Sequence, residues 1–492
     1  MSRFLFLCVL RILFLNLFLW FITITTWSQS CKPFVLRFNT HPHQDKICST
    51  ALIEDLTELQ SMLLEIHPDL YRHSPKAVLD SAYLSAVNQC RTDKTLFEFA
   101  QIINDYLMEI KDSHTFFNLR ELLSYQRSAT YYLPCLVSKI NNQWIITKAW
   151  KNQLPVGAEL LKFDGMAPEK LIEVSRGSSP IEANSWEAQQ ELSDHVLSTV
   201  LNLSSLKKLV SVTHRFHGDT ITQVVHPPRV KKIMKSADFI GEFKNITYHK
   251  QGQKAIIKIP SFSPNSIAWF KKRLDEVFSA VMKDSIEALA IDLRDNTGGY
   301  IVLQEYLMSF LAPPGTRYVN QYVYKRSDYD RFEQLSSYQK WRFKKTALRF
   351  YPNGAIAKEW DFYNSPKGTV DTVVNDPVLS NKNNIQFKGS CSLLINGMSM
   401  SAAANFAAWF IENNRGPSLG TAPSGTFSGT FANPATVYLT NTALPVMIST
   451  MKVNSLNEAL LNQPIYPSML LTPNQSNIEH GEDVLKTYFL NN

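Results

Sequence analysis

Serine, histidine and glycine residues near the ends of apolar segments are the candidates for chemistry in this sequence. Ser401 follows the apolar run 391–395 after a short polar turn, and it precedes an alanine-rich stretch with the pattern of a helix. A serine at the start of a helix lies beside free backbone N–H groups, which suits a nucleophile next to an oxyanion hole. The alternative interpretation is a helix N-cap, a common structural role that Ser399 would fill equally well.

A second apolar run, at 288–293, leads into a pair of glycines. Gly298 and Gly299 follow it, and glycines at the end of a strand can turn their N–H groups toward a ligand oxygen. The alternative is a tight turn with a buried ion pair. Polar residues alternate just before the glycines and could brace either structure: Asp292, Arg294 and Asn296.

His114 is the candidate base. It lies in the polar cluster 111–115, directly after a segment with helical periodicity at 96–110. Histidine can accept and return a proton near neutral pH. Because His114 and Ser401 are far apart in the sequence, this role requires the fold to bring them together. The alternative is an ordinary surface histidine.

The hydrophobic pattern divides the chain into regions that would position these residues. Apolar residues spaced by three and four predict a helical N-terminal cap over 48–125. Alternating segments predict a β-rich module over 126–235. Apolar strand-like runs followed by helical stretches predict an α/β domain over 236–492. Residues 313–390, which are aromatic and weakly patterned, are expected to form an insertion or lid within it.

The N-terminus has the pattern of an export signal. Residues 4–27 are almost wholly apolar, and Ser28 and Ser30 are small residues of the kind that a signal peptidase reads. We therefore predict a cleaved signal peptide over 1–30 and an exported protein, periplasmic or secreted. An uncleaved membrane anchor is the alternative. A lipoprotein at Cys31 is less favoured, because Ser28 stands where an apolar residue is usual.

The overall composition is that of a folded globular protein. The 492 residues are 45% hydrophobic and 19% charged, which excludes a disordered chain, a coiled coil and a collagen-like repeat. The formal net charge of +7 is spread over a long chain, so nucleic acid binding is not expected. Any membrane contact is expected only through an uncleaved N-terminus, and the sequence does not indicate an oligomeric state.

The cysteines and histidines do not form a recognisable metal motif, so no metal or cofactor is expected. The chain contains six cysteines, and removal of the signal peptide with Cys8 would leave five. An odd number leaves at least one thiol without an intrachain partner. Cys31 and Cys48 are close enough in sequence to form a disulfide in an oxidising compartment. The alternative is that all five are buried apolar residues.

Five short motifs occur in a fixed order along the chain. They are His67 to Tyr71, Asp112 to Thr115, Leu154 to Gly165, Asp292 to Gly299 and Ser399 to Ala403. Together and in this order they resemble the superfamily of the carboxy-terminal processing peptidases and the tricorn protease core. This resemblance implies a ClpP/crotonase-like α/β catalytic domain preceded by a helical cap and a PDZ-like module. It also implies serine peptidase activity.

The resemblance also implies roles for the residues at the two turns. Ser401 matches the nucleophile of the family. The N–H group of Ala402, with that of Gly298 or Gly299, matches the oxyanion hole, and the sequence does not decide between the two glycines. The processing-peptidase branch uses a lysine base, but the corresponding stretch 420–426 has none.

The base therefore matches the tricorn-like branch, in which a serine precedes a histidine. Ser113 and His114 fit this pattern, and Glu458 lies where the family has a glutamate that supports the serine. The sequence thus predicts an exported serine peptidase that hydrolyses peptide bonds in peptides or proteins. The alternative is an inactive family member that serves as an exported peptide- or protein-binding module. An esterase elbow is not favoured, because Ser401 stands where the second glycine of G-x-S-x-G would be.

Overall fold

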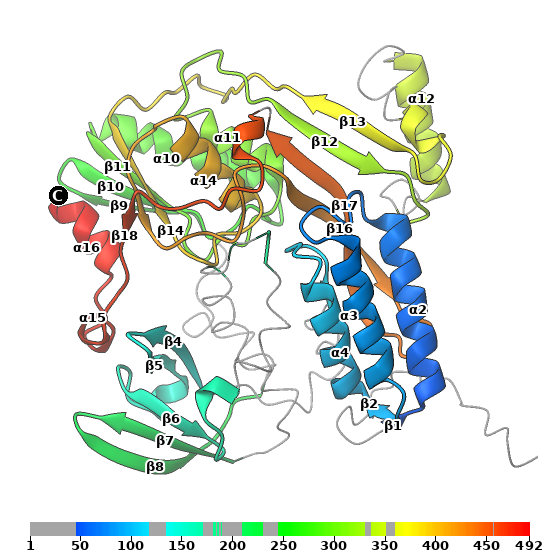
Figure 1. Ribbon diagram of the computed structural model, residues 1–492. Coiled ribbons are helices and arrows are strands. Elements are labelled where there is room, and N and C mark those ends of the chain that lie inside the picture. The colour runs from blue at the N-terminus through cyan, green and yellow to red at the C-terminus, as the bar shows by residue number, and fades with distance from the viewer. Residues whose placement is uncertain are drawn as a thin grey trace, which may run out of the picture.

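The computed structural model arranges most of the chain around three main sheets and one small two-stranded sheet (Figure 1). The predicted signal peptide 1–30 and Cys31 lie outside the residues that it describes. Within the described part of the chain, no helix has both the length and the apolar character needed to cross a membrane. The described residues are 46–117, 134–170, 181–183, 185, 188, 209–229, 245–329, 336–350, 360–455 and 457–492.

A six-stranded sheet forms the centre of the C-terminal half. Its strand order is β18-β15-β14-β11-β10-β9, and the pairs from β10 to β18 are parallel. Strand β9, at one edge, pairs antiparallel with β10. Parallel strands end at the same edge of a sheet, which gathers the turns that follow them. The strands are β9 (Thr247–Gln251), β10 (Lys254–Lys258), β11 (Ala288–Asp292), β14 (Ser390–Ile395), β15 (Ser418–Gly420) and β18 (Met469–Leu470).

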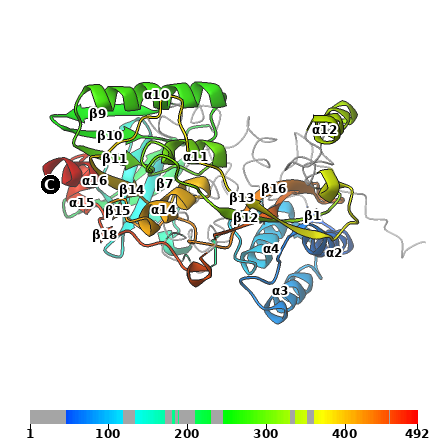
Figure 2. The ribbon, with the colours of Figure 1, turned by 90° about the horizontal axis from the view of Figure 1, so that it is seen from above.

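Helices cover both faces of this sheet. Successive strand residues point to opposite faces, so Ile257 packs with three helices while its neighbour Ile256 packs against α16. Burial on both faces explains why the strands appear in the sequence as continuous apolar runs. Figure 2 shows α10 and α11 alongside strands β9 to β11. The helices are α10 (Ile267–Lys283), α11 (Ile301–Met308), α14 (Ala402–Glu412) and, on the other face, α16 (Val484–Asn491).

A second sheet pairs a short strand from the N-terminal part of the chain with strands from its C-terminal part. Its order is β13-β12-β17-β16, with β3 paired to β17. Three N-terminal helices pack on β16 and β17, and their apolar stripe, including Leu52 and Leu56, is fully buried there. β12 and β13 come from the predicted insertion 313–390. The elements are α2 (Ser49–Ile66), α3 (Lys76–Gln89), α4 (Leu96–Met108), β3 (Phe116–Phe117), β12 (Asn320–Lys325), β13 (Val370–Asn375), β16 (Thr430–Tyr438) and β17 (Pro445–Ser455).

A third, antiparallel sheet has its own apolar core. It contacts the short helix α15 (Gln475–Glu479), where His217 Nε2 lies 2.7 Å from Glu479 Oε1. The remaining small elements are β1 (Lys46–Ile47) paired with β2 (Lys94–Thr95), and the helices η1 (Trp150–Asn152), η2 (Glu458–Leu460) and α12 (Ser337–Phe350). The strands of the antiparallel sheet are β4 (Cys135–Ile140), β5 (Gln143–Ala149), β6 (Glu159–Phe163), β7 (Val210–Phe216) and β8 (Asp219–Val225).

The predicted fold class is confirmed as a mixed α/β protein with several sheets. The helix expected at 96–110 corresponds to α4, which begins at a capping box formed by Thr95 and Glu98. Cys48 is disulfide-bonded. The described cysteines other than Cys48 are free and buried, and burial raises the pKa of each thiol: Cys90, Cys135 and Cys391. These three therefore fit the alternative of buried apolar residues.

Candidate active site

Ser401 occupies a sharp turn between β14 and α14. Its backbone has φ +51° and ψ −122°, a conformation that favours glycine and is strained for a residue with a side chain. Although Ser401 is the N-cap residue of α14, its side chain makes no capping hydrogen bond. The Oγ atom lies 3.2 Å from Nε2 of His114 instead. Ser399 has a structural role, because its hydroxyl donates to the carbonyl oxygen of Leu293 at 2.8 Å.

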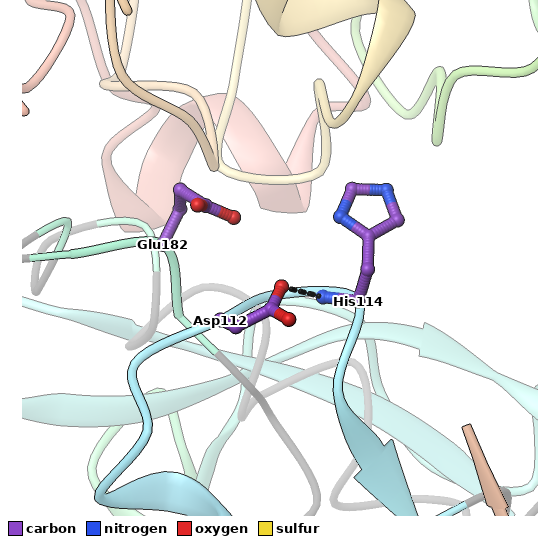
Figure 3. A group of neighbouring side chains, drawn as sticks. All are labelled: Asp112, His114 and Glu182. Carbon is purple, nitrogen blue, oxygen red and sulfur yellow. Dashed lines mark hydrogen bonds between the residues drawn. The ribbon is translucent and has the colours of Figure 1, made fainter. Parts of the chain in front are cut away.

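His114 is held in the short connection between α4 and β3. Its backbone N–H donates to Asp112 Oδ1 at 2.7 Å (Figure 3). The other oxygen of Asp112 accepts hydrogen bonds from Thr115 Oγ1 at 2.5 Å and, at 3.1 Å, from His67 Nε2. Burial alone would raise the pKa of the Asp112 carboxyl, but the hydrogen bond and charge of His67 hold it below its usual range. The motif at His67 thus anchors the turn that carries His114.

A hydrogen-bond relay continues behind the histidine. His114 Nδ1 lies 3.0 Å from Ser113 Oγ, and Ser113 Oγ donates to Glu182 Oε2 at 2.6 Å. A carboxylate can only accept, so the single hydroxyl proton of Ser113 is directed to Glu182. Ser113 must then accept from His114 Nδ1–H. This arrangement leaves Nε2 without a proton and able to accept the hydrogen of the Ser401 hydroxyl.

Glu182 is fully buried and fixed by several donors. Oε2 also accepts from the backbone N–H of Ser113 at 3.2 Å, and Oε1 accepts from that of Phe431 at 3.1 Å. His73 Nε2 lies 3.5 Å from Oε1. The sequence analysis assigned the support of Ser113 to Glu458. The structure describes the backbone of Glu458 in η2 but not its side chain, and it places Glu182 next to Ser113.

The two glycines of the neighbouring turn differ in their hydrogen bonds. The N–H of Gly298 donates to Asn296 Oδ1 at 2.9 Å. Gly299 forms a parallel bridge with Phe262 in which the bonds use the N–H of Phe262 and the N–H of Tyr300. Within the described residues, the N–H of Gly299 therefore has no hydrogen-bond partner.

Both glycines are required by close packing. A Cβ on Gly298, at φ +92°, would lie 2.6 Å from the Cβ of Ser401. A Cβ on Gly299, at φ +139°, would lie 2.2 Å from the carbonyl carbon of Phe262. Ala402 is the first residue of α14, so its N–H has no partner within the helix. Ala402 adjoins Ser401 in the chain, and Gly299 lines the same cavity as Ser401, so their N–H groups are candidates to bind a negatively charged oxygen.

The polar residues before the glycines were expected to stabilise their loop. In the structure, Arg294 forms ion pairs with two carboxylates, and these three side chains make an ion triad. Arg294 Nη2 lies 2.7 Å from Asp292 Oδ2, and Arg294 Nη1 lies 2.7 Å from Asp483 Oδ1. Asp483 also caps α16 through the N–H of Lys486. Burial alone would raise the pKa of the Asp483 carboxyl, but the hydrogen bond and charge of Arg294 lower it. The triad therefore ties the loop after β11 to the C-terminal helix.

The side chains drawn in Figure 3 are also close enough to hold a metal ion. One ligand atom each from Asp112, His114 and Glu182 lie within 4.8 Å of one another. However, the oxygens of Asp112 and Glu182 already accept hydrogen bonds, and both His114 nitrogens are engaged. A metal ion would have to displace this relay, so the donor set fits proton transfer better than metal binding.

Comparison with known protein families gives a match for the region that contains Ser401 and the glycine turn. Residues 253–467 match the profile of peptidase family S41. This region belongs to peptidase family S41. The predicted resemblance and the predicted class, a serine-type peptidase, are thereby confirmed. A comparison with curated proteins found no match.

Several solved structures are similar to this chain. Mature CPAF is 16% identical, with a TM-score of 0.60 over 90% of this chain and 96% of that chain. A CPAF variant is 14% identical, with a TM-score of 0.64 over the same shares. The photosystem II D1 C-terminal processing protease is 12% identical, with a TM-score of 0.41 over 89% of this chain and 98% of that chain. The likeness to CPAF shows a shared fold along most of the chain, including the segments outside the S41 match.

One residue of the site, Glu182, was not found from the sequence, and the detailed role of a second, Asn296, was not predicted. Glu182 lies in a stretch of the predicted β-rich module without a regular pattern, and its contact with Ser113 joins residues 69 positions apart. Asn296 was noted as a brace, but its choice of Gly298 as a partner depends on the loop geometry. The alternation of polar residues before the glycines was the signal for Asn296, whereas we find no signal in the sequence for Glu182.

Proposed function

We propose that this protein is an exported serine peptidase in which Ser401 attacks the peptide carbonyl and His114 is the general base. The observation that carries this proposal is the continuous relay from Ser401 through His114 and Ser113 to Glu182. The relay fixes the tautomer of the imidazole that the reaction requires. A merely structural histidine would not need this orientation.

The geometry supports the following reaction. Ser401 Oγ attacks the carbonyl carbon while its proton passes to His114 Nε2. The N–H groups of Gly299 and Ala402 bind the oxyanion, a contribution of about 3–4 kcal/mol per donor in comparable sites. His114 then donates its proton to the leaving amine, which completes the acyl-enzyme. A water molecule, deprotonated by the same nitrogen, releases the acyl group and restores Ser401.

The flanking parts of the chain have proposed roles as well. Residues 48–125 act as a helical cap that supplies the base, and residues 126–235 act as a PDZ-like module that holds substrate by adding a strand to a sheet edge. Export rests on the predicted signal peptide at 1–30. The disulfide at Cys48 supports it, because such bonds persist in oxidising compartments.

Covalent labelling tests the nucleophile directly. A fluorophosphonate probe should label the wild-type protein at Ser401, because it reacts with hydroxyl groups that have an adjacent base. The Ser401→Ala variant should remain unlabelled. Intact-mass and peptide mass spectrometry would give the stoichiometry and the site.

If the probe did not label the wild-type protein, this result would contradict the proposed peptidase function and favour the alternative, an exported binding module. The matched control is Ser399→Ala, whose hydroxyl is engaged with the main chain rather than with His114. Labelling that disappears in the Ser399→Ala variant while the protein stays folded would also contradict the assignment of Ser401.

Glu182 is proposed as the positioning residue of the relay. Replacing Glu182 by Gln removes its charge but keeps its shape, so we expect kcat to fall by about 10²-fold with little change in KM. The acidic limb of the pH–rate profile should also move to lower pH, since the protonated imidazole loses a nearby negative charge. Steady-state kinetics from pH 5 to 9 would measure both effects.

The matched control for this variant is Glu458→Gln, because the sequence analysis placed the same role there. We expect its kcat and pH profile to stay close to those of the wild type. The reverse result, with the larger loss in Glu458→Gln, would move the role to Glu458. If kcat fell in Glu182→Gln without any shift of the pH profile, Glu182 would stabilise the fold and would not position the imidazole.

A further inference from the structure

A cavity of about 410 Å³ opens directly beside the proposed nucleophile. Ser401 and Gly299 line it, so it adjoins both the attacking oxygen and the proposed oxyanion site. Its other walls come from α11, from the neighbouring strands β12 and β13, and from β16 and β17. This cavity is therefore a space beside Ser401 that can take the side chain of the substrate residue whose carbonyl is attacked.

One carboxylate lines the cavity, and within the described residues it forms no ion pair. Glu305, on α11, is the only acidic residue among the described residues that line it. Asn375 Nδ2 donates to Oε1 at 3.1 Å, and no contact within the described residues occupies Oε2. Partial burial raises the pKa of Glu305, which the hydrogen bond from Asn375 and the charge of Lys271 partly oppose. Burial of this kind makes a cationic partner favourable.

The cavity also contains one lysine, but its charge is used elsewhere. Lys325 Nζ donates to the carbonyl oxygen of Leu64 at 2.5 Å and approaches that of His67 at 3.5 Å. These carbonyls lie at the C-terminal end of α2, where a cation is stabilised by the helix dipole. Lys271, which influences Glu305, has its Nζ 4.8 Å from the ring centroid of Tyr306 and does not line the cavity. Glu305 is therefore the charge that the cavity offers to a ligand.

Aromatic rings line the path to this carboxylate. Tyr322 and Tyr324 are in edge-to-face contact, with ring centroids 6.4 Å apart, and Phe362 follows at 6.1 Å from Tyr324. Asn375 also donates to the hydroxyl of Tyr322 at 3.0 Å, which places this ring next to Glu305. Aromatic faces pack against aliphatic stems and attract cations. This combination fits a long side chain with a positive end.

We propose that this cavity binds a lysine or arginine side chain, so that the protein cleaves peptide bonds on the carboxyl side of basic residues. Glu305 is the specificity-determining residue. The proposal rests on the proposed peptidase function, because it identifies the cavity as the subsite next to Ser401. It concerns the choice of substrate rather than the chemistry of cleavage.

Acetylated fluorogenic tripeptide amides that differ only in the residue before the cleaved bond test this choice. Acetylation removes the N-terminal amine, so the side chain is the only cation. We expect kcat/KM for lysine and arginine to exceed that for norleucine, the neutral analogue of lysine, by about 10²-fold. In Glu305→Gln the lysine and arginine values should fall to the norleucine value, which should itself change less than about threefold.

The matched control is Glu412→Gln. Glu412 lines the neighbouring cavity, which shares Asn405 and Thr430 with this one, so it reports a general loss of negative charge. Its preference for basic residues should equal that of the wild type. Equal cleavage of lysine and norleucine substrates by the wild type, or an unchanged preference in Glu305→Gln, would overturn the proposal while leaving the peptidase function intact.

Binding separates this proposal from a failure of catalysis. The Ser401→Ala variant cannot cleave, so isothermal titration calorimetry would measure its affinity for the same acetylated tripeptides as free acids. We expect the lysine peptide to bind at least tenfold more tightly than the norleucine peptide, and the difference to vanish in the double variant with Glu305→Gln. Equal affinities for the two peptides would overturn the proposal even if the wild type proved catalytically silent.

Discussion

The Ser401→Gly variant is expected to be inactive and more stable than Ser401→Ala. Both variants lose the nucleophile, so peptide hydrolysis should fall by at least about 10⁴-fold in each. Both also lose the hydrogen bond to His114. They differ only in a Cβ atom at a backbone with φ +51° and ψ −122°. Glycine adopts this conformation without strain, whereas a residue with a Cβ does not.

The expected difference in the free energy of unfolding is about 1 kcal/mol in favour of glycine, because relief of about 1–3 kcal/mol of strain exceeds the entropic cost of glycine. Glycine is also favoured over alanine at an ordinary N-cap, whereas within a helix the order reverses. Urea unfolding of the two variants, followed by tryptophan fluorescence, measures the difference. If Ser401→Ala proved the more stable variant, the turn would not be strained.

His114→Ala should show the second large effect, a fall in kcat of about 10³–10⁴-fold with KM nearly unchanged. The base acts on the bond-making step and not on substrate binding. The turn itself should persist, because Asp112 binds the backbone N–H of residue 114 and not its ring. The thermal midpoint should therefore move little, and labelling of Ser401 by the fluorophosphonate should slow by a similar factor.

The control for this variant is His249→Ala, an exposed histidine of β9 far from Ser401 in the sequence. Its kcat should match that of the wild type. Steady-state kinetics with one peptide substrate would compare the three proteins. Wild-type turnover in His114→Ala would remove the proposed base and, with it, the proposed mechanism.

Local patterns in the sequence predicted the elements that carry the site. The apolar runs before Gly298 and Ser401 became β11 and β14 because both strands are buried on two faces. The helix before His114 became α4 because its apolar stripe packs against the neighbouring helices. Within these elements, the position of each candidate in a turn follows from residue type and order alone.

Other parts of the site depend on contacts between distant segments and were not accessible from local patterns. The choice between Gly298 and Gly299 depends on which N–H group the Asn296 side chain binds. Glu182 reaches Ser113 through a segment without periodicity, whereas Glu458 was suggested by resemblance. The residues 313–390 lacked a clear apolar pattern, because Asn320 is the only buried residue in β12 and β13.

The connection between α4 and β3 brings His114 to Ser401 only when distant segments of the chain have paired. His114 follows α4, which belongs to the core built by the N-terminal helices, and Ser401 precedes α14, which belongs to the core of the six-stranded sheet. β3 reaches its partner β17 only after residues 445–455 have been synthesised. A partly made or unfolded chain therefore holds Ser401 and His114 apart. The proposed peptidase activity should accordingly appear only after both cores have assembled, which for an exported chain is after it has crossed the membrane.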